Sequence, residues 1–428
     1  MKNVLSSLIL AALSAQAAAA PQASSKAASA PAVLSPAKAA NASGASAASA
    51  PASAKPAVPA APPTVLGVGT AANVPAISAT SYVVKDLHSN QVLAQKNADQ
   101  QIEPASLTKM MTAYLVFQAL ENGKLKPSQM LTVSDKGYQA EGSRMFLRPG
   151  RPASVSDLVK GLAVNSANDA AITLAEAIAG SEESFVGMMN AEAARLGMKN
   201  TRFANSTGLY TEGHLSTAGD LAVLAGALIN DYPKYYPVFS LKSFTYNKIE
   251  QPNRNLLLYR DSSVDGLMIG FSNIAGYNLA ASSKRNGRRV ISILTGAESV
   301  ESRASESSKL LNWALQTYDT PKLYDAGQAI SQVRVYKGNS KAVNVGFIDT
   351  SFITIPHGTG KNIKPILETV QPVLAPVQKG KVLGKLKIMQ GSKVLVEKEV
   401  VALNGVEEAG WFGRTWDSIR LWFRSMIQ

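Results

Sequence analysis

The sequence predicts an α+β domain followed by a smaller all-β domain. Strand-like patterns occur at both ends of residues 74–320, and helical patterns fill the region between them. After Thr320 the pattern changes to short alternating runs without a convincing helix. We therefore expect the two ends of the first domain to share one antiparallel sheet, with the helices clustered on it. The second domain, residues 321–410, is expected to be a β-sandwich.

Two segments precede the α+β domain. Residues 1–19 contain one lysine, an apolar run from Val4 to Leu13 and small residues around Ala15-Gln16-Ala17, which is the pattern of a secretory signal peptide. The apolar run is shorter than the roughly 20 residues that a membrane span needs. Residues 20–73 consist mostly of alanine, serine and proline and contain no aromatic residue, so they are expected to form a disordered linker.

The elements of the α+β domain follow from apolar spacing and turn residues. A strand over 80–85 turns at Ser89-Asn90 into a partner strand over 92–94, and a second hairpin pairs 277–283 with 290–294. Helices are predicted over 106–118, 155–164, 168–178, 182–196, 217–229 and 300–317. The strands of the second domain are predicted over 333–336, 342–347, 352–355, 382–389 and 393–401.

Composition limits the chemistry that the chain can perform. The sequence has no cysteine and three scattered histidines, His88, His214 and His357, so neither a metal site nor another cofactor is expected. Covalent catalysis would have to use an oxygen or amine nucleophile. The formal net charge of +13 suits an anionic partner, such as a phospholipid surface, an acidic cell-wall polymer or nucleic acid, and composition does not distinguish them.

Two polar clusters carry candidate chemistry. Ser106 and Lys109 lie three residues apart at a predicted helix start, so a hydroxyl and an amine share one face, where a desolvated lysine can act as a neutral base. Ser166 and Asn168 lie between two predicted helices and offer a second hydroxyl and an amide that can hold a substrate carbonyl. Each cluster also has a simpler interpretation, because serine, asparagine and aspartate are ordinary helix caps and most lysines are solvated.

Several longer motifs in the same order extend these clusters. They are residues 104–112 (PASLTKMMT), 166–170 (SANDA), 185–190 (FVGMMN), 264–266 (VDG) and 275–279 (AGYNL). From about Val74 to the C-terminus, the sequence resembles the low-molecular-mass penicillin-binding proteins. These are serine D-Ala-D-Ala carboxypeptidases with a penicillin-binding/serine β-lactamase-like fold, which trim peptidoglycan stem peptides and are inhibited by β-lactams. The resemblance implies a peptidoglycan pentapeptide substrate, a role in cell-wall biogenesis, and neither a nucleic-acid partner nor a cofactor.

The resemblance also implies roles for individual residues. Ser106 matches the nucleophile that forms the acyl-enzyme, and Lys109 matches its general base. Ser166 matches the serine that passes the proton to the leaving D-alanine, and Asn168 matches the residue that holds the substrate amide. The oxyanion hole would use the backbone N–H of Ser106 and one near Phe271.

One motif departs from the family pattern. Where the family has Lys-Thr-Gly on the strand beside the cleft, this sequence has Met268-Ile269-Gly270, which lacks both the charge and the hydroxyl that help to bind the substrate carboxylate. Gly270 would still permit close approach of a substrate backbone. Arg303 matches a family arginine near the cleft and is a candidate for the missing charge, although it could equally be a helix-surface residue beside Glu301 and Glu306.

The C-terminal residues 411–428 form the last informative pattern. At helical spacing, most of their tryptophan, phenylalanine and other apolar residues fall on one arc, and the arginines and other polar residues lie opposite. Such a helix suits the membrane interface and, together with the signal peptide, predicts a peripheral location on the periplasmic face of the inner membrane. The alternative is a helix packed on its own β domain.

Three other functions stay open at this point. The first is a catalytically impaired homologue that still binds peptidoglycan or a partner, which Met268 and Ile269 suggest. The second is a β-lactamase, against which the C-terminal domain and tail argue. A histidine-dependent serine hydrolase is the least favoured, since no histidine falls in a motif.

Overall fold

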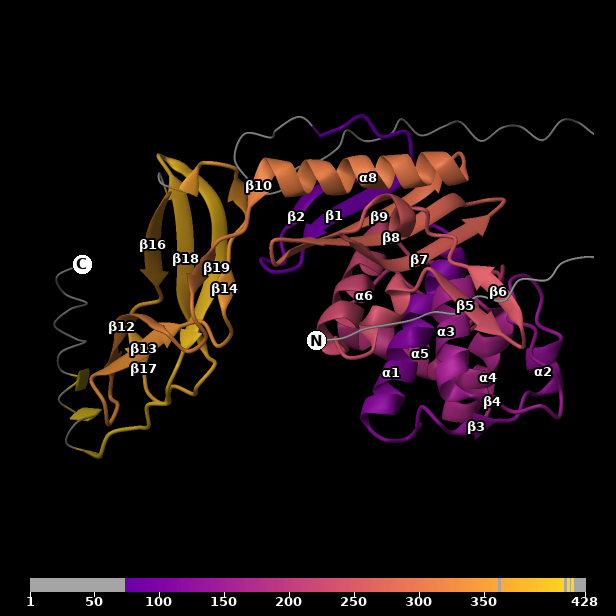
Figure 1. Cartoon of the computed structure of the whole chain (residues 1–428). Coiled ribbons are helices and arrows are strands. Elements are labelled where there is room, and N and C mark those ends of the chain that lie inside the picture. Colours follow the sequence, from indigo (N-terminus) through magenta and orange to yellow (C-terminus); the bar gives the residue numbers. More distant parts are fainter. Residues whose placement is uncertain (1–73, 361–362, 412–413, 416, 419–428) are drawn as a thin grey trace, which may run out of the picture. The chain divides into compact units, whose positions relative to one another are not determined.

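The computed structural model describes residues 74–360, 363–411, 414–415 and 417–418 (Figure 1). The predicted signal peptide and linker, and most of the predicted C-terminal helix, lie outside the described residues. Within the described residues, no helix is long and apolar enough to cross a membrane.

A five-stranded sheet organises the first domain. Its strand order is β2 (Val92–Lys96), β1 (Ser81–Asp86), β9 (Arg288–Ala297), β8 (Gly276–Arg285) and β7 (Val264–Ser272), with every neighbouring pair antiparallel. The pairing of β1 with β9 confirms that the two ends of the domain share one sheet. Because β7 is the edge strand, one row of its backbone N–H and C=O groups faces away from the sheet.

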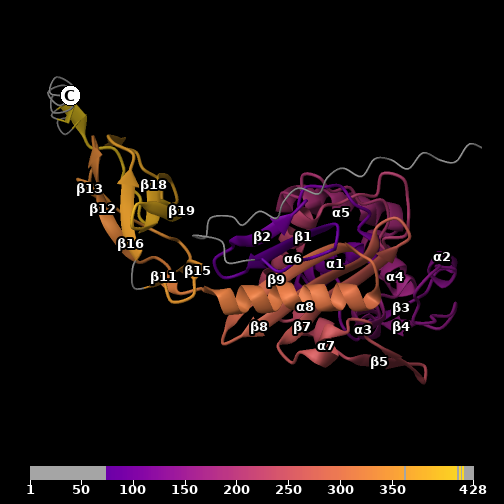
Figure 2. The same ribbon diagram turned by 90° about the horizontal axis from the view of Figure 1, so that it is seen from above.

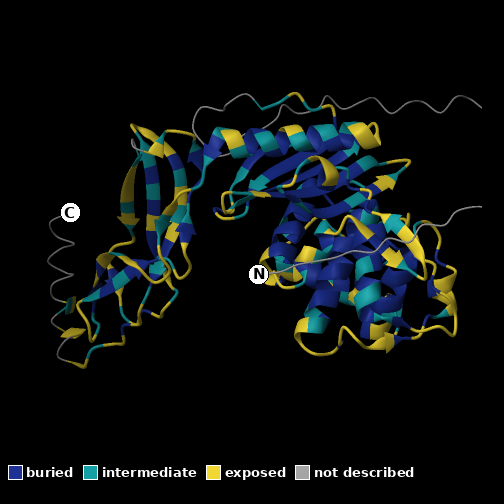
Figure 3. Cartoon of the chain, in the orientation of Figure 1, coloured by how far each residue is buried: buried dark blue, intermediate teal, exposed yellow. Residues whose placement is uncertain are grey.

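The sheet separates two apolar cores because side chains alternate along each strand. On β1, Val83 packs with the helical cluster, whereas Tyr82 and Val84 pack with α8 (Val300–Thr317) on the opposite face. Figure 2 shows α8 lying along β8 and β9, and Figure 3 shows many buried residues in the strands of the sheet and in α8. This layered α+β architecture is the predicted fold.

The helical cluster contains α1 (Lys109–Glu121), α3 (Val155–Asn165), α4 (Asn168–Ala179), α5 (Glu182–Leu196) and α6 (Ala218–Asp231). Their positions agree with the predicted helices to within a few residues. Hydroxyl caps define several starts: Ser154, Ser181, Thr217 and Ser299 each accept a hydrogen bond from the backbone N–H three residues on, ahead of α3, α5, α6 and α8.

Several short elements were not predicted. They are β3 (Met130–Leu131), α2 (Asp135–Tyr138), β4 (Ala153–Ser154), η2 (Tyr236–Ser240), β5 (Ser243–Tyr246), β6 (Ile249–Pro252) and α7 (Leu257–Arg260). The β5–β6 hairpin turns at Asn247 and Lys248, both of which have positive φ. Since lysine rarely adopts that conformation, the sequence contains no clear hairpin signal at this turn.

The second domain is all-β, as predicted. Its main sheet has the order β16 (Ile363–Thr369), β18 (Val382–Gln390), β19 (Lys393–Ala402), β13 (Ala342–Gly346), β12 (Ala329–Tyr336) and β17 (Val373–Leu374). Only two residue pairs join β13 to β19, so the sheet consists of two three-stranded halves. Residues of both halves share one apolar core, which is the arrangement of a small sandwich.

The strands of the main sheet that were not predicted, β16 and β17, lie at its two edges. Pro365 interrupts the strand pattern of β16, and an edge strand tolerates proline because one side of it needs no partner. The single strand predicted over 352–355 is instead two short ones, β14 (Ser351–Phe352) and β15 (Ile355–Pro356). They pair with β11 (Lys322–Tyr324) and β10 (Tyr318–Asp319), respectively.

The described part of the C-terminal tail contacts the second domain through polar atoms. Arg414 forms an ion pair of 2.7 Å with Glu408, and the Asp417 carboxylate accepts the backbone N–H of Lys337 at 2.6 Å. The apolar arc predicted for this tail lies mainly in residues outside the described ones.

Candidate active site

Ser106 lies on a tight turn at the start of α1. The turn is a 3-10 helix, η1 (Ala105–Thr108), that runs directly into α1. Ala105, just before Ser106, has a φ of 47°, which is costly for a residue with a side chain. The backbone of Gly208 packs against this turn, since a Cβ atom there would lie 1.8 Å from the Ala105 carbonyl oxygen. The surrounding fold therefore holds the candidate nucleophile in a fixed, strained position.

Lys109 is buried directly beside Ser106. Its side chain is 0% exposed, and its Nζ lies 3.1 Å from the Ser106 Oγ and 2.6 Å from the Thr207 carbonyl oxygen. Burial lowers the pKa of Lys109 to about 7, while the negative charge of Asp169 acts in the opposite direction. A large fraction of this lysine is therefore a neutral amine near neutral pH, so the interpretation as a solvated lysine is wrong.

Ser166 and Asn168 present unused polar atoms. Ser166 ends α3 with a φ of 56°, and Asn168 begins α4. The Ser166 Oγ and the Asn168 Oδ1 are both buried and have no hydrogen-bond partner, whereas the Asn168 Nδ2 donates to the Glu141 carbonyl oxygen at 2.6 Å. Buried polar atoms rarely stay unpaired unless a ligand or water completes them. These two atoms are therefore available to a substrate.

The Asp169 carboxylate stabilises the loop that packs against the start of α4. Its carboxylate accepts the backbone N–H groups of Met145 and Leu147, each at 3.0 Å. In the same loop, the Ser143 carbonyl oxygen accepts the backbone N–H of Asn168 at 2.7 Å. Asp169 thus connects the loop before α3 to the start of α4 and places its charge near Lys109.

These groups meet in a cleft of about 270 Å³. Ser106, Ser166 and Asn168 line it from the helical side, and Ile269, Gly270 and Phe271 line it from β7. Phe271 is 51% exposed and packs against Tyr277, with 4.5 Å between the ring centroids. The cleft therefore has a polar helical wall and an apolar strand wall.

Met268 and Gly270, the other two residues of the altered motif, have different surroundings from Ile269. Met268 is only 2% exposed and packs within the helical core, and it does not line the cleft. Gly270 was expected to make room for a substrate backbone. A Cβ atom there would instead lie 3.2 Å from the Pro104 carbonyl oxygen and 3.4 Å from the Leu107 side chain. The glycine thus lets β7 approach the turn that carries Ser106.

Arg254 is a cleft residue that the sequence analysis missed. It lines the cleft, and its Nη1 donates to the Ser143 Oγ at 3.1 Å. The flanking asparagines hold its turn, since Asn253 donates to the Leu241 carbonyl oxygen at 3.0 Å and Asn255 donates to that of Gly266 at 3.2 Å. In the sequence, an arginine between two turn-forming asparagines is only a weak signal of a functional residue. Its place in the cleft is evident only from the fold.

Arg303, the predicted source of positive charge, lies behind the strand wall. It is 4% exposed, does not line the cleft, and donates from Nη1 to the Gly270 carbonyl oxygen at 3.2 Å. Burial lowers its pKa to about 10, which Tyr277 opposes and the nearby charge of Arg254 reinforces. Arg303 remains a cation at neutral pH, but its contact is with β7. Its interpretation as a helix-surface residue is also wrong.

No histidine takes part in the Ser106 site. His214 is buried close to η1, where its Nε2 lies 2.9 Å from the Thr108 Oγ1 and its Nδ1 accepts the Ala204 N–H at 3.3 Å. Burial lowers its pKa to about 4, so the ring is neutral. It has no hydrogen bond to Ser106 and links structural segments. Among the described residues, no group of histidine, cysteine, aspartate or glutamate side chains could hold a metal ion.

The serine after the strained Ala105, the buried amine and the polar groups of Ser166 and Asn168 together form an arrangement suited to serine acyl transfer, and comparison with known proteins agrees. Residues 68–299 match the peptidase S11 family, D-alanyl-D-alanine carboxypeptidase, and residues 318–408 match the C-terminal domain of penicillin-binding protein 5. The chain therefore belongs to the serine-type D-Ala-D-Ala carboxypeptidases of family S11, which act in peptidoglycan metabolism.

Individual relatives cover most of the chain. The D-alanyl-D-alanine carboxypeptidase DacC of Escherichia coli is 40% identical over 375 residues, which are 85% of this chain and 94% of the relative. DacA of the same organism is 38% identical over 82% of this chain and 89% of the relative. The crystal structure of penicillin-binding protein 5 from Haemophilus influenzae matches with a TM-score of 0.76 at 39% identity, covering 79% of this chain and all of that one.

Proposed function

We propose that this chain is an active carboxypeptidase that removes the terminal D-alanine from peptidoglycan stem peptides through an acyl-enzyme on Ser106. The observation that carries the proposal is the buried Lys109 amine, 3.1 Å from the Ser106 Oγ and with a pKa of about 7. A serine hydroxyl is a poor nucleophile at neutral pH unless a neighbouring base accepts its proton.

The first step forms the acyl-enzyme. A neutral Lys109 amine has two N–H groups and one lone pair, so it keeps its bond to the Thr207 carbonyl oxygen and still accepts the Ser106 proton. The Ser106 Oγ attacks the carbonyl carbon between the two D-alanines, and the backbone N–H of Ser106 and one from β7 stabilise the developing oxyanion. The peptide C–N bond breaks as its nitrogen gains a proton and leaves with the terminal D-alanine.

Ser166 and Asn168 complete this step. The unpaired Ser166 hydroxyl is available to pass a proton to the leaving nitrogen, and the unpaired Asn168 Oδ1 is available to accept a substrate amide N–H. The proton that Lys109 took from Ser106 leaves by this route, so the amine is neutral again. Water then attacks the ester carbon and gives a proton to Lys109, and Lys109 passes that proton to the Ser106 Oγ as the ester bond breaks. The Ser166 Oγ and the Asn168 Oδ1, which have no hydrogen-bond partner in the described part of the protein, would thus each gain one when substrate binds.

The terminal carboxylate needs a positive partner, and Arg254 is the cation that lines the cleft. Arg303 acts behind it by holding the Gly270 carbonyl and adding its charge from beneath β7. Because Ile269 contributes no hydroxyl, we expect carboxylate binding to be weaker than in relatives that have the full Lys-Thr-Gly motif.

The decisive test measures D-alanine release from a pentapeptide together with the site of a labelled penicillin adduct. We expect release by the mature protein and an adduct on Ser106 that disappears in Ser106→Ala. Ser128→Ala, at an exposed position outside the cleft, is the matched control. An adduct mapped to another residue, or no release above the Ser106→Ala background, would contradict the proposal.

A catalytically impaired binding protein is the second candidate, and the apolar strand wall favours it. That candidate predicts a slowly formed Ser106 adduct with penicillin but no measurable turnover of the pentapeptide. The same two measurements therefore separate the two functions.

We also propose that residues 411–428 hold the enzyme peripherally on anionic lipid at the periplasmic face of the inner membrane. The sequence pattern of an aromatic arc opposite a cationic arc supports this location. Vesicle flotation with and without the tail tests it, and equal flotation would refute it. Arg420→Glu combined with Arg424→Glu should weaken attachment mainly at low salt, where surface charge is least screened.

A further inference from the structure

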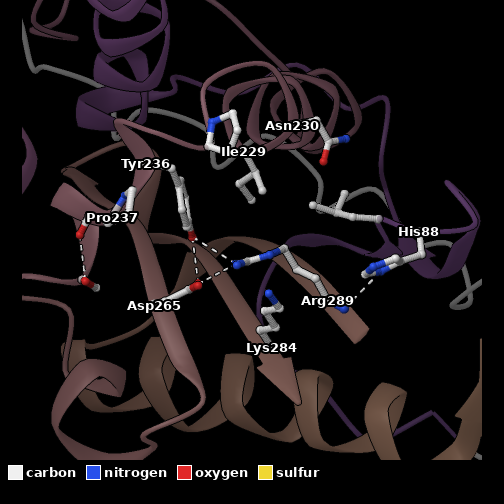
Figure 4. Close-up of a pocket in the computed structure, with 11 residues that line it drawn as sticks. His88, Ile229, Asn230, Tyr236, Pro237, Asp265, Lys284 and Arg289 are labelled. Carbon is white, nitrogen blue, oxygen red and sulfur yellow. Dashed lines mark hydrogen bonds and ion pairs between the residues drawn. The ribbon is translucent and has the colours of Figure 1, made fainter. Parts of the chain in front are cut away.

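A second pocket lies on the first domain, away from the Ser106 cleft (Figure 4). Its volume of about 420 Å³ falls within the usual range of small-molecule sites, roughly 300–1,000 Å³. The end of α6, the η2 segment, the start of β7, the end of β8, the start of β9 and the turn after β1 form it, and it shares no lining residue with the cleft. Asp265, at its base, precedes Gly270 by about 17 Å along the extended β7 strand.

The arginines near the turn of the β8–β9 hairpin form ion pairs within the described part of the chain, whereas its lysine does not. Arg285, Arg288 and Arg289 each form an ion pair of 2.7 Å, with Asp261, Asp86 and Asp265, respectively. Lys284 differs from them because its ammonium has no ion pair or hydrogen bond among the described residues. Figure 4 shows its side chain lining the pocket and extending toward the Asp265–Arg289 pair. One unpaired cation therefore faces the cavity.

Arg289 is fixed in place beside this lysine. Its side chain is 13% exposed, and its Nη1 donates to Asp265 at 2.7 Å and to the Ser282 Oγ at 2.5 Å. The Tyr236 hydroxyl donates to the same Asp265 oxygen at 2.9 Å, and the guanidinium lies over the Tyr236 ring at 5.1 Å. The hydrogen bonds of the Arg289 side chain to described residues all use Nη1, so Nε and Nη2 keep N–H groups for another acceptor. The Arg289 guanidinium is thus held in place, and part of its hydrogen-bonding capacity stays free for a ligand.

The remaining lining is mainly aliphatic and faces these cations. Leu87, Ile229, Pro233 and Pro237 supply apolar surface, and the exposed His88 also lines the pocket, where its Nδ1 accepts the backbone N–H of Arg289 at 3.4 Å. Because Nδ1 is the acceptor in this bond, the Nε2 of His88 carries an N–H and offers one more donor. Two cations and one carboxylate leave a single positive charge, which matches a monoanion better than a phosphate dianion placed beside Asp265.

We propose that this pocket is a second, non-catalytic site that binds a small carboxylate-bearing ligand. The carboxylate bonds to the Lys284 ammonium and the free N–H groups of Arg289, and the body of the ligand covers Ile229, Pro233 and Pro237. The site is independent of the proposed peptidase activity. Two sources have this chemistry, an acidic amino sugar and the C-terminal end of a peptide.

Calorimetric titration of the mature protein distinguishes these sources. The probes are N-acetylmuramic acid for an acidic sugar, N-acetyl-L-leucine for a peptide end, N-acetylglucosamine as a sugar without a carboxylate, and inorganic phosphate. We expect saturable binding of at least one carboxylate probe and weaker binding of both N-acetylglucosamine and phosphate. The tighter of the two carboxylates identifies the source.

Three variants locate the binding. Lys284→Gln should weaken the affinity for the carboxylate probe about tenfold, because it removes a charge-assisted contact at a solvent-accessible position. Lys234→Gln, an exposed lysine near the pocket that does not line it, should leave binding unchanged, as should Arg254→Gln in the cleft.

Four outcomes would overturn the proposal. They are no saturable binding of either carboxylate, unchanged binding in Lys284→Gln, a loss in Arg254→Gln without one in Lys284→Gln, and tighter binding of phosphate or N-acetylglucosamine than of both carboxylates. Thermal unfolding of each variant checks that the fold is intact.

Discussion

The two walls of the Ser106 cleft differ in what they supply. The helical wall contains Ser106, the proposed nucleophile, together with the Ser166 hydroxyl and the Asn168 amide, and the Lys109 amine is buried beside Ser106. The strand wall presents an isoleucine, a glycine and an exposed phenylalanine, and its arginine, Arg303, lies behind the strand. The helical wall thus has the groups for bond making and breaking, whereas the strand wall has few groups that can hold a charged substrate end.

This difference separates catalysis from recognition. Changes in the helical wall should affect acylation by any substrate or inhibitor, because they act on the nucleophile and its base. Changes around the strand wall should depend on whether the ligand has a terminal carboxylate. Four measurements test this division.

The largest effect is expected for Lys109→Ala. Loss of the general base should slow acylation by pentapeptide and by penicillin alike, by roughly a thousandfold, since general bases contribute about 10²–10⁴-fold. Stopped-flow or gel-based acylation rates measure the effect, and the exposed Lys124→Ala is the control. Acylation within tenfold of the wild type would show that another group activates Ser106.

The next effect concerns the cation in the cleft. Arg254→Ala should lower kcat/KM for the pentapeptide about tenfold, mainly through KM, because an exposed charge-assisted contact to the carboxylate is lost. Arg303→Ala should mainly lower kcat. It removes the hydrogen bond to the Gly270 carbonyl oxygen, so β7 is held less firmly beside the cleft. The reverse pattern of KM and kcat would mean that Arg303 binds the carboxylate and Arg254 does not.

The pH profile tests the state of the base. Lys109 accepts a proton only as the neutral amine, and burial lowers its pKa to about 7. Acylation should therefore be level above that pH and fall about tenfold per unit below it, because the protonated fraction then rises. Penicillin acylation between pH 5 and 9 measures this profile, and a constant rate across pH 7 would contradict the assigned base.

The smallest change is a gain from the strand wall. Ile269→Thr places a hydroxyl at a position that lines the cleft and should raise kcat/KM for the pentapeptide several-fold. Adding Met268→Lys should lower thermal stability, because Met268 is buried in the helical core and a charged amine there is costly. Ile269→Val, which adds no hydroxyl, is the control, and an equal gain in both variants would attribute the effect to cleft volume alone.

Sequence patterns predicted the longer helices of the first domain because apolar residues recur at helical spacing and hydroxyl caps mark the starts of α3, α5, α6 and α8. The pairing of β1 with β9 followed from strand patterns at the two ends of the domain. The β5–β6 hairpin could not be predicted, since it turns on an asparagine and a lysine with positive φ. Its position matters because Arg254 follows it directly.

Within the site, local spacing identified residues on one helix turn but not contacts across the fold. Ser106 and Lys109 are three residues apart, and their bond follows from helical geometry. That Met268 is buried, that Arg303 bonds to β7, and that Arg254 lines the cleft all depend on how distant segments pack. The match of Arg303 to a family arginine near the cleft makes it a candidate for the missing charge, but the sequence does not show on which side of β7 it lies.

The bond between Lys109 and the Thr207 carbonyl joins residues 98 positions apart. In a partly folded chain this contact is missing and Lys109 is solvated, so it is a charged ammonium at neutral pH and cannot accept the Ser106 proton. If Ser106 is the nucleophile that we propose, it should therefore stay unreactive until the segment around Gly208 has packed against its turn. Covalent labelling by a β-lactam should consequently report completion of folding, and during refolding it should appear after the helical circular dichroism signal has recovered.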